Sequence, residues 1–74
     1  MALCACLPGE RHEVGLLASS VLLKEAGFRV TYLGADLPLA ELRSAVQERR
    51  PRLVVLSSTM APPPAILREL QALF

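Results

Sequence analysis

The sequence has few aromatic residues and no long basic stretch, and each lack excludes a class of function. Only Phe28, Tyr32 and Phe74 carry aromatic rings, too few to form a platform on which single-stranded nucleic acid stacks. The net charge is +1, and the densest basic stretch is RRPR at residues 49–52. Because DNA binding needs a longer basic stripe, we expect no direct contact between these residues and nucleic acid.

Long apolar runs and catalytic motifs are also missing. No run reaches the roughly 18 residues that cross a bilayer, and the opening MALCACLP lacks the basic start of a signal peptide. We therefore expect a cytoplasmic protein with no membrane partner. There is no nucleophile–base pair and no glycine-rich phosphate loop, which argues against an enzyme acting alone. Cys4 and Cys6 lie on one side of a strand-like run, where we expect buried, reduced thiols rather than a disulfide.

What remains is an apolar chain with a regular alternation of patterns. Its 74 residues are 53% hydrophobic and 20% charged, enough for one small domain. Residues 2–7, 29–35 and 53–56 read as buried strands, and each is followed by a segment with helical periodicity. This β-α-β-α-β-α order predicts an α/β fold with a parallel, Rossmann-like (flavodoxin-like) sheet, covered by helices on both faces and with the first strand in the middle. The third strand would form an unprotected edge.

The helical segments carry more specific expectations. Asp36 is expected to cap the second helix, with Pro38 in its first turn. Pro51 would end that helix, and residues 62–64 (PPP) would open the third. In the first helix, Leu16 and Leu23 widen the apolar side, so we expect this helix to contact something besides the sheet. The stripe predicted to face the sheet consists of Val14, Leu17, Ala18, Val21 and Leu22.

The candidate site lies where two loops meet. In parallel sheets the binding crevice lies beyond the carboxyl ends of the strands, so residues 8–13 and 57–61 are predicted to converge. The first loop contains the only histidine, His12, with Glu10 two residues before it. An imidazole in this position is a candidate metal ligand whose second nitrogen is held by an acid. Gly9 and Gly15 would let a large group approach the backbone. The alternative is a solvated histidine, with Glu10 only favouring the helix dipole.

The motif ERHEVG at residues 10–15 resembles the D/E-x-H-x-x-G signature of cobalamin-binding domains. In that family the signature is followed after about forty residues by S-x-L, and here forty-one residues separate Gly15 from Ser57. The segments GERHEVGLL, YLGADLP and VVLSS are most similar to light- and cobalamin-responsive MerR-type transcription regulators, of the CarH and LitR kind. The resemblance covers nearly all of this chain, which would be the N-terminal half of a cobalamin-binding domain (residues 1–74).

The resemblance implies a cofactor and a role for several residues. The cofactor would be cobalamin, as adenosylcobalamin or methylcobalamin, with His12 as the lower axial ligand of cobalt. Glu10 would orient the imidazole, and Gly15 would admit the nucleotide tail between the first strand and the first helix. A serine that assists the histidine–acid pair in several members is not evident after Ser57. The implied cofactor-binding residues are Gly9, Glu10, Arg11, His12, Glu13, Val14, Gly15, Leu16, Ser57, Ser58 and Thr59; within this set, Ser57 and Thr59 would line the nucleotide slot and Arg11 and Glu13 would flank the ligand on the rim.

The same resemblance implies a function. The chain would be the cobalamin-sensing module of a transcription regulator that forms a homo-oligomer, responds to light and contacts DNA only through a domain outside this chain. One alternative is a corrinoid-carrying domain of a methyltransferase or mutase. Another is a half-domain without cofactor that dimerises through its third strand and third helix.

Overall fold

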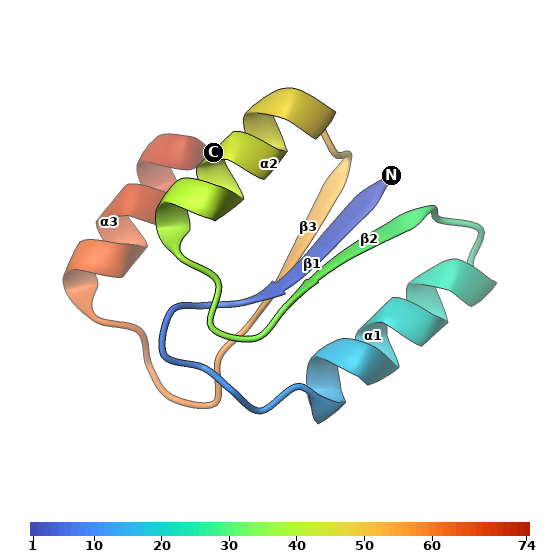
Figure 1. The fold of residues 1–74 in the computed structure, drawn as a ribbon, viewed down its shortest axis with the longest axis horizontal. Helices are drawn as coiled ribbons and strands as arrows, with labels where there is room; N and C mark the ends of the chain where they lie inside the picture. The colour runs from blue at the N-terminus through green and yellow to red at the C-terminus, as the bar shows by residue number, and fades with distance from the viewer.

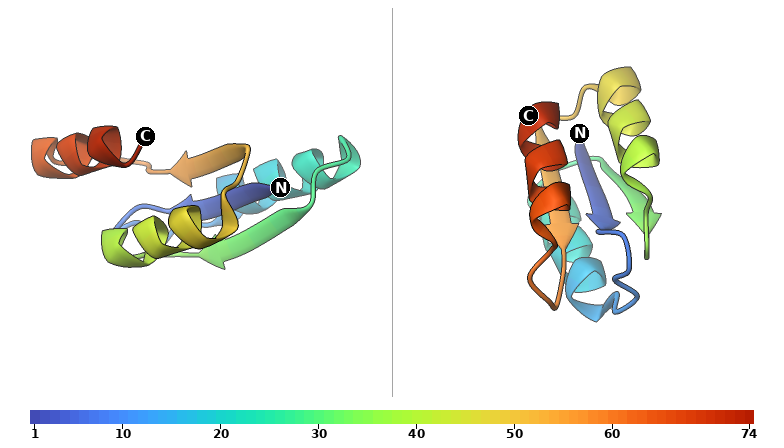
Figure 2. Two further views of the ribbon diagram at one scale, coloured as in Figure 1. Left: turned by 90° about the horizontal axis from the view of Figure 1, so that it is seen from above. Right: turned by 90° about the vertical axis from the view of Figure 1, so that its left-hand side faces the viewer.

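The computed structural model describes residues 1–74, and strands and helices alternate along the chain as the sequence predicts (Figure 1). The three strands pair in parallel in the order β2-β1-β3, which confirms the α/β class and the central position of the first strand. Helix α1 packs against one face of the sheet, and α2 and α3 lie together on the other side (Figure 2). The elements are β1 (Ala2–Cys6), α1 (Val14–Glu25), β2 (Val30–Gly34), α2 (Leu39–Arg49), β3 (Leu53–Ser57) and α3 (Pro64–Leu73).

Strand β1 forms the centre of a small core. All five of its residues are buried, because neighbours flank it on both edges and helices cover both faces. Cys4 and Cys6 pack with Leu16 of α1, and both cysteines are free thiols, as predicted. Burial raises the pKa of both, and for Cys6 the charges of Glu13 and Glu10 add to this effect. Side chains alternate along a strand, so Leu3 points to the opposite face, where α2 contributes the buried Leu42.

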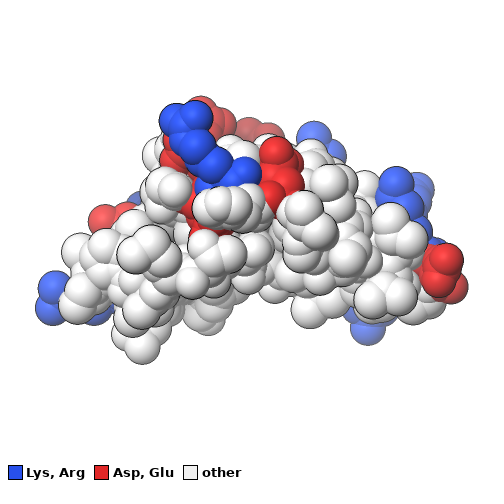
Figure 3. Space-filling model, turned by 90° about the horizontal axis from the view of Figure 1, so that it is seen from below, with Lys and Arg blue, Asp and Glu red and all other residues white.

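The side of α1 that faces the sheet is not the predicted one. Leu16 and Ser20 are its buried residues, whereas Val14 is 82% exposed and Leu22 is 65% exposed. Leu17 and Val21, also in the predicted stripe, are exposed too. The helix carries apolar residues on all sides, so its periodicity allowed more than one stripe. The loop that leads into α1 selects among them, because it fixes the rotation at which the helix meets β1. As a result, the outer face of α1 is apolar, and charge lies mainly at the rims of that side of the molecule (Figure 3).

The start of α2 also differs from the prediction. The residue before the helix is Pro38, which offers no side-chain capping bond, and Asp36 lies outside the helix in a left-handed conformation with φ 49°. The Asp36 carboxylate instead accepts a hydrogen bond from the Gly9 amide. The other helix boundaries follow the sequence, since α2 ends at Arg49, shortly before Pro51, and α3 begins at Pro64.

The periphery of the fold is lightly packed. Only 10 of the 74 residues are buried, and β3 lies at an edge of the sheet, as expected. None of the helices combines the length and the apolar character required to cross a membrane.

Candidate functional site

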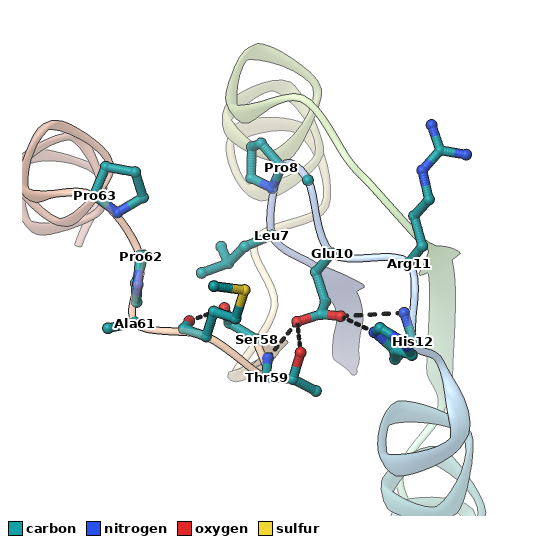
Figure 4. A pocket seen from close by; sticks show the side chains of 12 residues that line it. Leu7, Pro8, Glu10, Arg11, His12, Ser58, Thr59, Ala61, Pro62 and Pro63 are labelled. Carbon is teal, nitrogen blue, oxygen red and sulfur yellow. Dashed lines mark hydrogen bonds and ion pairs between the residues drawn. The ribbon is translucent and has the colours of Figure 1, made fainter.

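The two loops predicted to converge do so beyond the carboxyl ends of β1 and β3. Between them lies a hollow of about 430 Å³ (Figure 4). Residues from Leu7 to His12 form one wall, and residues from Ser58 to Pro63 form the other. Of the residues assigned to the site from the sequence, Gly9, Glu10, Arg11, His12, Ser58 and Thr59 line this hollow.

Glu10 joins the two walls. Its side chain is only 6% exposed. One carboxylate oxygen, Oε1, accepts hydrogen bonds from the Thr59 hydroxyl at 2.7 Å and from the Thr59 main-chain amide. The other, Oε2, lies 2.9 Å from His12 Nδ1 and accepts the His12 amide at 3.2 Å. The carboxylate is thus shared between residues forty-nine positions apart in the chain.

These hydrogen bonds stabilise the charged form of Glu10. The Thr59 amide has the largest effect, followed by the Thr59 hydroxyl and the His12 imidazole, and together they lower the pKa of Glu10 to about 2. A carboxylate that stays ionised is a firm acceptor for a ring N–H. We therefore assign the ring proton of His12 to Nδ1, facing Glu10.

This tautomer leaves the other ring nitrogen available. The His12 side chain is 81% exposed, and Nε2 has no hydrogen-bond partner within the chain. A neutral imidazole held through Nδ1 presents the lone pair of Nε2 as a ligand, and the acid behind it raises its basicity. Nowhere does the structure gather three or more His, Cys, Asp or Glu side chains, so this loop offers a single nitrogen rather than a chelating set.

The role of Thr59 differs from the expected one. The sequence placed it along a slot, and the structure uses it to hold Glu10. A threonine hydroxyl, rather than a serine, thus binds the acid of the histidine–acid pair in this chain. The sequence feature that could have predicted this contact is the position of Thr59, two residues after Ser57. Strand β3 ends at Ser57, so the following residues lie beside the first loop.

A second hollow, of about 290 Å³, lies between α1 and β3. Gly15 and Leu16 line it from α1, and Ser57 and Ser58 line it from the end of β3. The resemblance implies entry of the nucleotide tail between β1 and α1; in the structure β1 is fully buried, and the hollow beside Gly15 lies between α1 and β3. A Cβ atom added at Gly15 would meet nothing within 4 Å, so the glycine is not required by the packing of this chain. Its missing side chain keeps the mouth of the hollow open.

Two of the assigned residues have other surroundings, and a third lies where it was expected. Glu13 was expected on the rim, but it accepts a hydrogen bond from the Tyr32 hydroxyl at 2.7 Å and lines neither hollow. Burial, reinforced by Glu13, raises the pKa of Tyr32 to about 12. Val14 projects into solvent, away from both hollows. Arg11 does lie on the rim, with its guanidinium 3.7 Å from the Asp36 carboxylate.

Comparison with known proteins identifies the family of the chain. The family described as B12 binding domain matches residues 1–71. The chain belongs to the B12 binding domain family. Its three-stranded parallel sheet with flanking helices is consistent with that assignment. No solved structure matches the chain.

Three curated relatives are similar to it. The HTH-type transcriptional repressor CarA of Myxococcus xanthus is 49% identical over 63 residues, which cover 85% of this chain and 22% of the repressor. The repressor CarH of the same organism is 46% identical over 54 residues, covering 73% of this chain and 18% of CarH. The Methanol–corrinoid protein of Methanosarcina barkeri is 32% identical over 57 residues, covering 77% and 22%. The chain thus spans about a fifth of the length of these relatives.

Proposed function

We propose that this chain is a cobalamin-binding and cobalamin-sensing module of a transcription regulator, with His12 as the lower axial ligand of cobalt. The observation that carries the proposal is the hydrogen-bonded series Thr59–Glu10–His12, which leaves Nε2 free at the edge of a hollow. Membership of the B12 binding domain family and the likeness to two repressors support the same reading.

The residues present fit this cofactor. Bound cobalamin supplies a cobalt ion held by its own ring, which needs one further nitrogen from the protein below it, and the loop offers one nitrogen. Glu10 orients that imidazole and increases its donor strength. The hollow between α1 and β3 adjoins the first through the shared residue Ser58, and would receive the nucleotide tail beside Gly15 and Ser57. Arg11 remains on the rim, where its guanidinium can meet polar groups of the ligand.

Titration of the 74-residue chain with aquocobalamin tests the proposal. The visible spectrum of the corrinoid reports the ligands of cobalt, so wild-type protein should produce a saturable change. His12→Ala should abolish this change while the far-UV circular dichroism of the protein stays the same. An unchanged spectrum with the wild type, or the same change with His12→Ala, would contradict the assignment of His12.

Wider roles belong to the same proposal. We propose that residues 1–74 form part of a cobalamin-binding domain in a cytoplasmic regulator, that the regulator forms a homo-oligomer, and that other parts of it contact DNA. The densest basic stretch here, residues 49–52, is far too short for a DNA-binding surface. Dependence on light is tested by illuminating a complex with adenosylcobalamin and measuring its mass by light scattering before and after. An identical mass would remove the light response from the proposal.

A second candidate is a corrinoid-carrying domain that serves an enzyme. The observation that favours it is the 32% identity to the Methanol–corrinoid protein. The lower ligand would be the same, so binding of aquocobalamin does not separate the two functions. The genomic sequence around the coding region does: DNA-binding helices in the same reading frame favour the regulator, and an adjacent methyltransferase favours the carrier.

A further inference from the structure

Asp36, in the loop between β2 and α2, is bound to the histidine loop at three successive residues. Its carboxylate oxygen Oδ1 accepts the Gly9 amide at 2.6 Å. Its own main-chain amide donates to the Glu10 carbonyl at 2.8 Å. Its other oxygen, Oδ2, lies 3.7 Å from the Arg11 guanidinium. Residues 9–11 lie outside every helix and strand, so these contacts replace the regular backbone pairing that the turn lacks.

The conformation of Asp36 carries a cost that these contacts offset. Its φ is 49°, in the left-handed region that most residues with a side chain avoid. Aspartate tolerates this region better than most residues, but glycine would adopt it more readily. The carboxylate is also not used as a helix cap, because α2 starts three residues later without a side-chain capping bond. The Asp36 side chain instead binds the loop of residues 9–11.

Glu10 is therefore held from two sides. Thr59 binds its carboxylate from the β3 side, and Asp36 binds its main chain from the β2 side. The next amide in the same loop, that of Leu37, donates to the Cys6 carbonyl at 3.1 Å and ties residues 36–37 to the end of β1. If the main chain at Glu10 shifts, the carboxylate moves relative to both Thr59 and the imidazole of His12.

We propose that Asp36 is a positioning residue for His12: by fixing the main chain of residues 9–11 it holds the Glu10 carboxylate in line with the imidazole. The inference deepens the proposed function, since the positioned nitrogen is the one that would bind cobalt. Its direct consequence concerns the protein without cofactor, and is measurable there.

Three variants separate the side chain from the backbone conformation. Asp36→Gly removes the carboxylate but favours the left-handed backbone conformation. Any effect of this variant on the histidine loop is therefore due to the missing carboxylate and not to backbone strain at residue 36. Asp36→Asn keeps an oxygen that can accept the Gly9 amide and tolerates the conformation. Arg50→Gly is the matched control, because Arg50 has nearly the same φ of 46° at the far end of α2 and touches neither hollow.

Nuclear magnetic resonance on the cofactor-free chain reads out the effect. Hydrogen exchange of the Gly9 amide should accelerate about tenfold in Asp36→Gly, because one hydrogen bond to a charged acceptor is lost. The nitrogen resonances of the imidazole should move as well, and His12 is the only histidine, so they need no separation from others. Asp36→Asn and Arg50→Gly should stay within about threefold of the wild-type exchange rate. The affinity for aquocobalamin should fall about tenfold in Asp36→Gly alone.

Two outcomes overturn the inference. In one, Asp36→Gly matches Arg50→Gly in Gly9 exchange and in the His12 resonances. In the other, Gly9 exchange accelerates while the His12 resonances stay in place, which makes Asp36 a clamp of the turn without effect on the imidazole. If wild-type protein leaves the spectrum of aquocobalamin unchanged, the proposed function fails separately, and the cofactor-free measurements still decide the role of Asp36.

Discussion

The two ends of the sheet differ in how the polar groups around their hollows are arranged. At the carboxyl end, the Glu10 carboxylate accepts hydrogen bonds from a hydroxyl, an imidazole and two loop amides beside a hollow of about 430 Å³. At the amino end lies a larger hollow, of about 670 Å³, lined by the loop Ala26–Arg29 and by Met1, Arg52 and Leu53. No side-chain hydrogen bond organises that larger space: Arg29 and Arg52 are both exposed and make no ion pair.

Convergence of polar groups, rather than size, therefore distinguishes the candidate site from the larger hollow. The loops that follow parallel strands all leave the sheet at its carboxyl end, where β2 and β3 lie on either side of β1. At this end, hydrogen bonds and an ion pair join side chains from loops that are distant in sequence. Specific recognition needs a few fixed polar groups, which the amino end lacks.

The largest expected effect is on cobalt ligation. His12→Ala should weaken binding of aquocobalamin by more than about 100-fold, because it removes the proposed ligand itself rather than a residue that supports it. The double variant Arg29→Ala/Arg52→Ala, which changes the amino-end hollow, should bind like wild type. Spectral titration measures both. Equal losses in the two variants would erase the distinction between the two ends.

A large effect is also expected on the titration of tyrosine. Tyr32 is the only tyrosine and tryptophan is absent, so phenolate absorbance near 295 nm reports this residue alone. In the folded chain its pKa is raised from 10 to about 12, so stability falls as the pH rises from about 10 towards 12, where only the unfolded chain is ionised. Moving the phenol to the amino end with Tyr32→Phe/Phe28→Tyr should return the pKa to about 10. A value near 10 in the wild-type protein would contradict the burial of the Tyr32 phenol and its contact with Glu13.

Glu10→Gln should reduce the affinity for aquocobalamin about 10- to 100-fold, the range for residues that support a metal ligand. It should also change the response to acid. The folded pKa of Glu10 is about 2 against an ordinary value of 4.5, so this group stabilises the fold above pH 4.5 and loses that effect as the pH falls towards 2. Urea denaturation from pH 5 to pH 2 should show a shallower loss of stability in Glu10→Gln. Parallel curves would mean that Glu10 is not held as described.

The smallest effect is expected for Thr59→Val, which removes the hydroxyl but keeps the main-chain amide that also binds Glu10. Affinity for aquocobalamin should fall about 3- to 10-fold, because the lost hydrogen bond supports His12 only indirectly, through Glu10. Thr59→Ser is the matched control and should retain most of the affinity, because it keeps the hydroxyl. If the valine variant binds as well as wild type, the amide of residue 59 alone is sufficient to hold the carboxylate.

Features that depend on residues close together in the sequence were predictable, and features that depend on contacts between distant residues were not. Continuous apolar runs predicted the strands, and the parallel topology predicted that residues 8–13 and 57–61 meet beyond the carboxyl ends of the strands. The sheet-facing side of α1 was not predictable, because Leu16 and Leu22 are equally apolar and only the entry angle of the helix decides which is buried. The prediction that Asp36 caps α2 was wrong. Capping preferences describe only neighbouring residues, whereas the Asp36 carboxylate binds the amide of Gly9, twenty-seven residues away.

The sequence by itself determined the strand–helix alternation, the parallel sheet with β1 in its centre, and the single imidazole two residues after an acid. These features depend on hydrophobic periodicity and on neighbouring residues, which act locally along the chain. The tertiary structure alone decided that Thr59 and Asp36 hold Glu10 from opposite sides, and that the second hollow opens between α1 and β3. Those contacts join three loops that only the assembled parallel sheet brings to one end, so no local pattern encodes them.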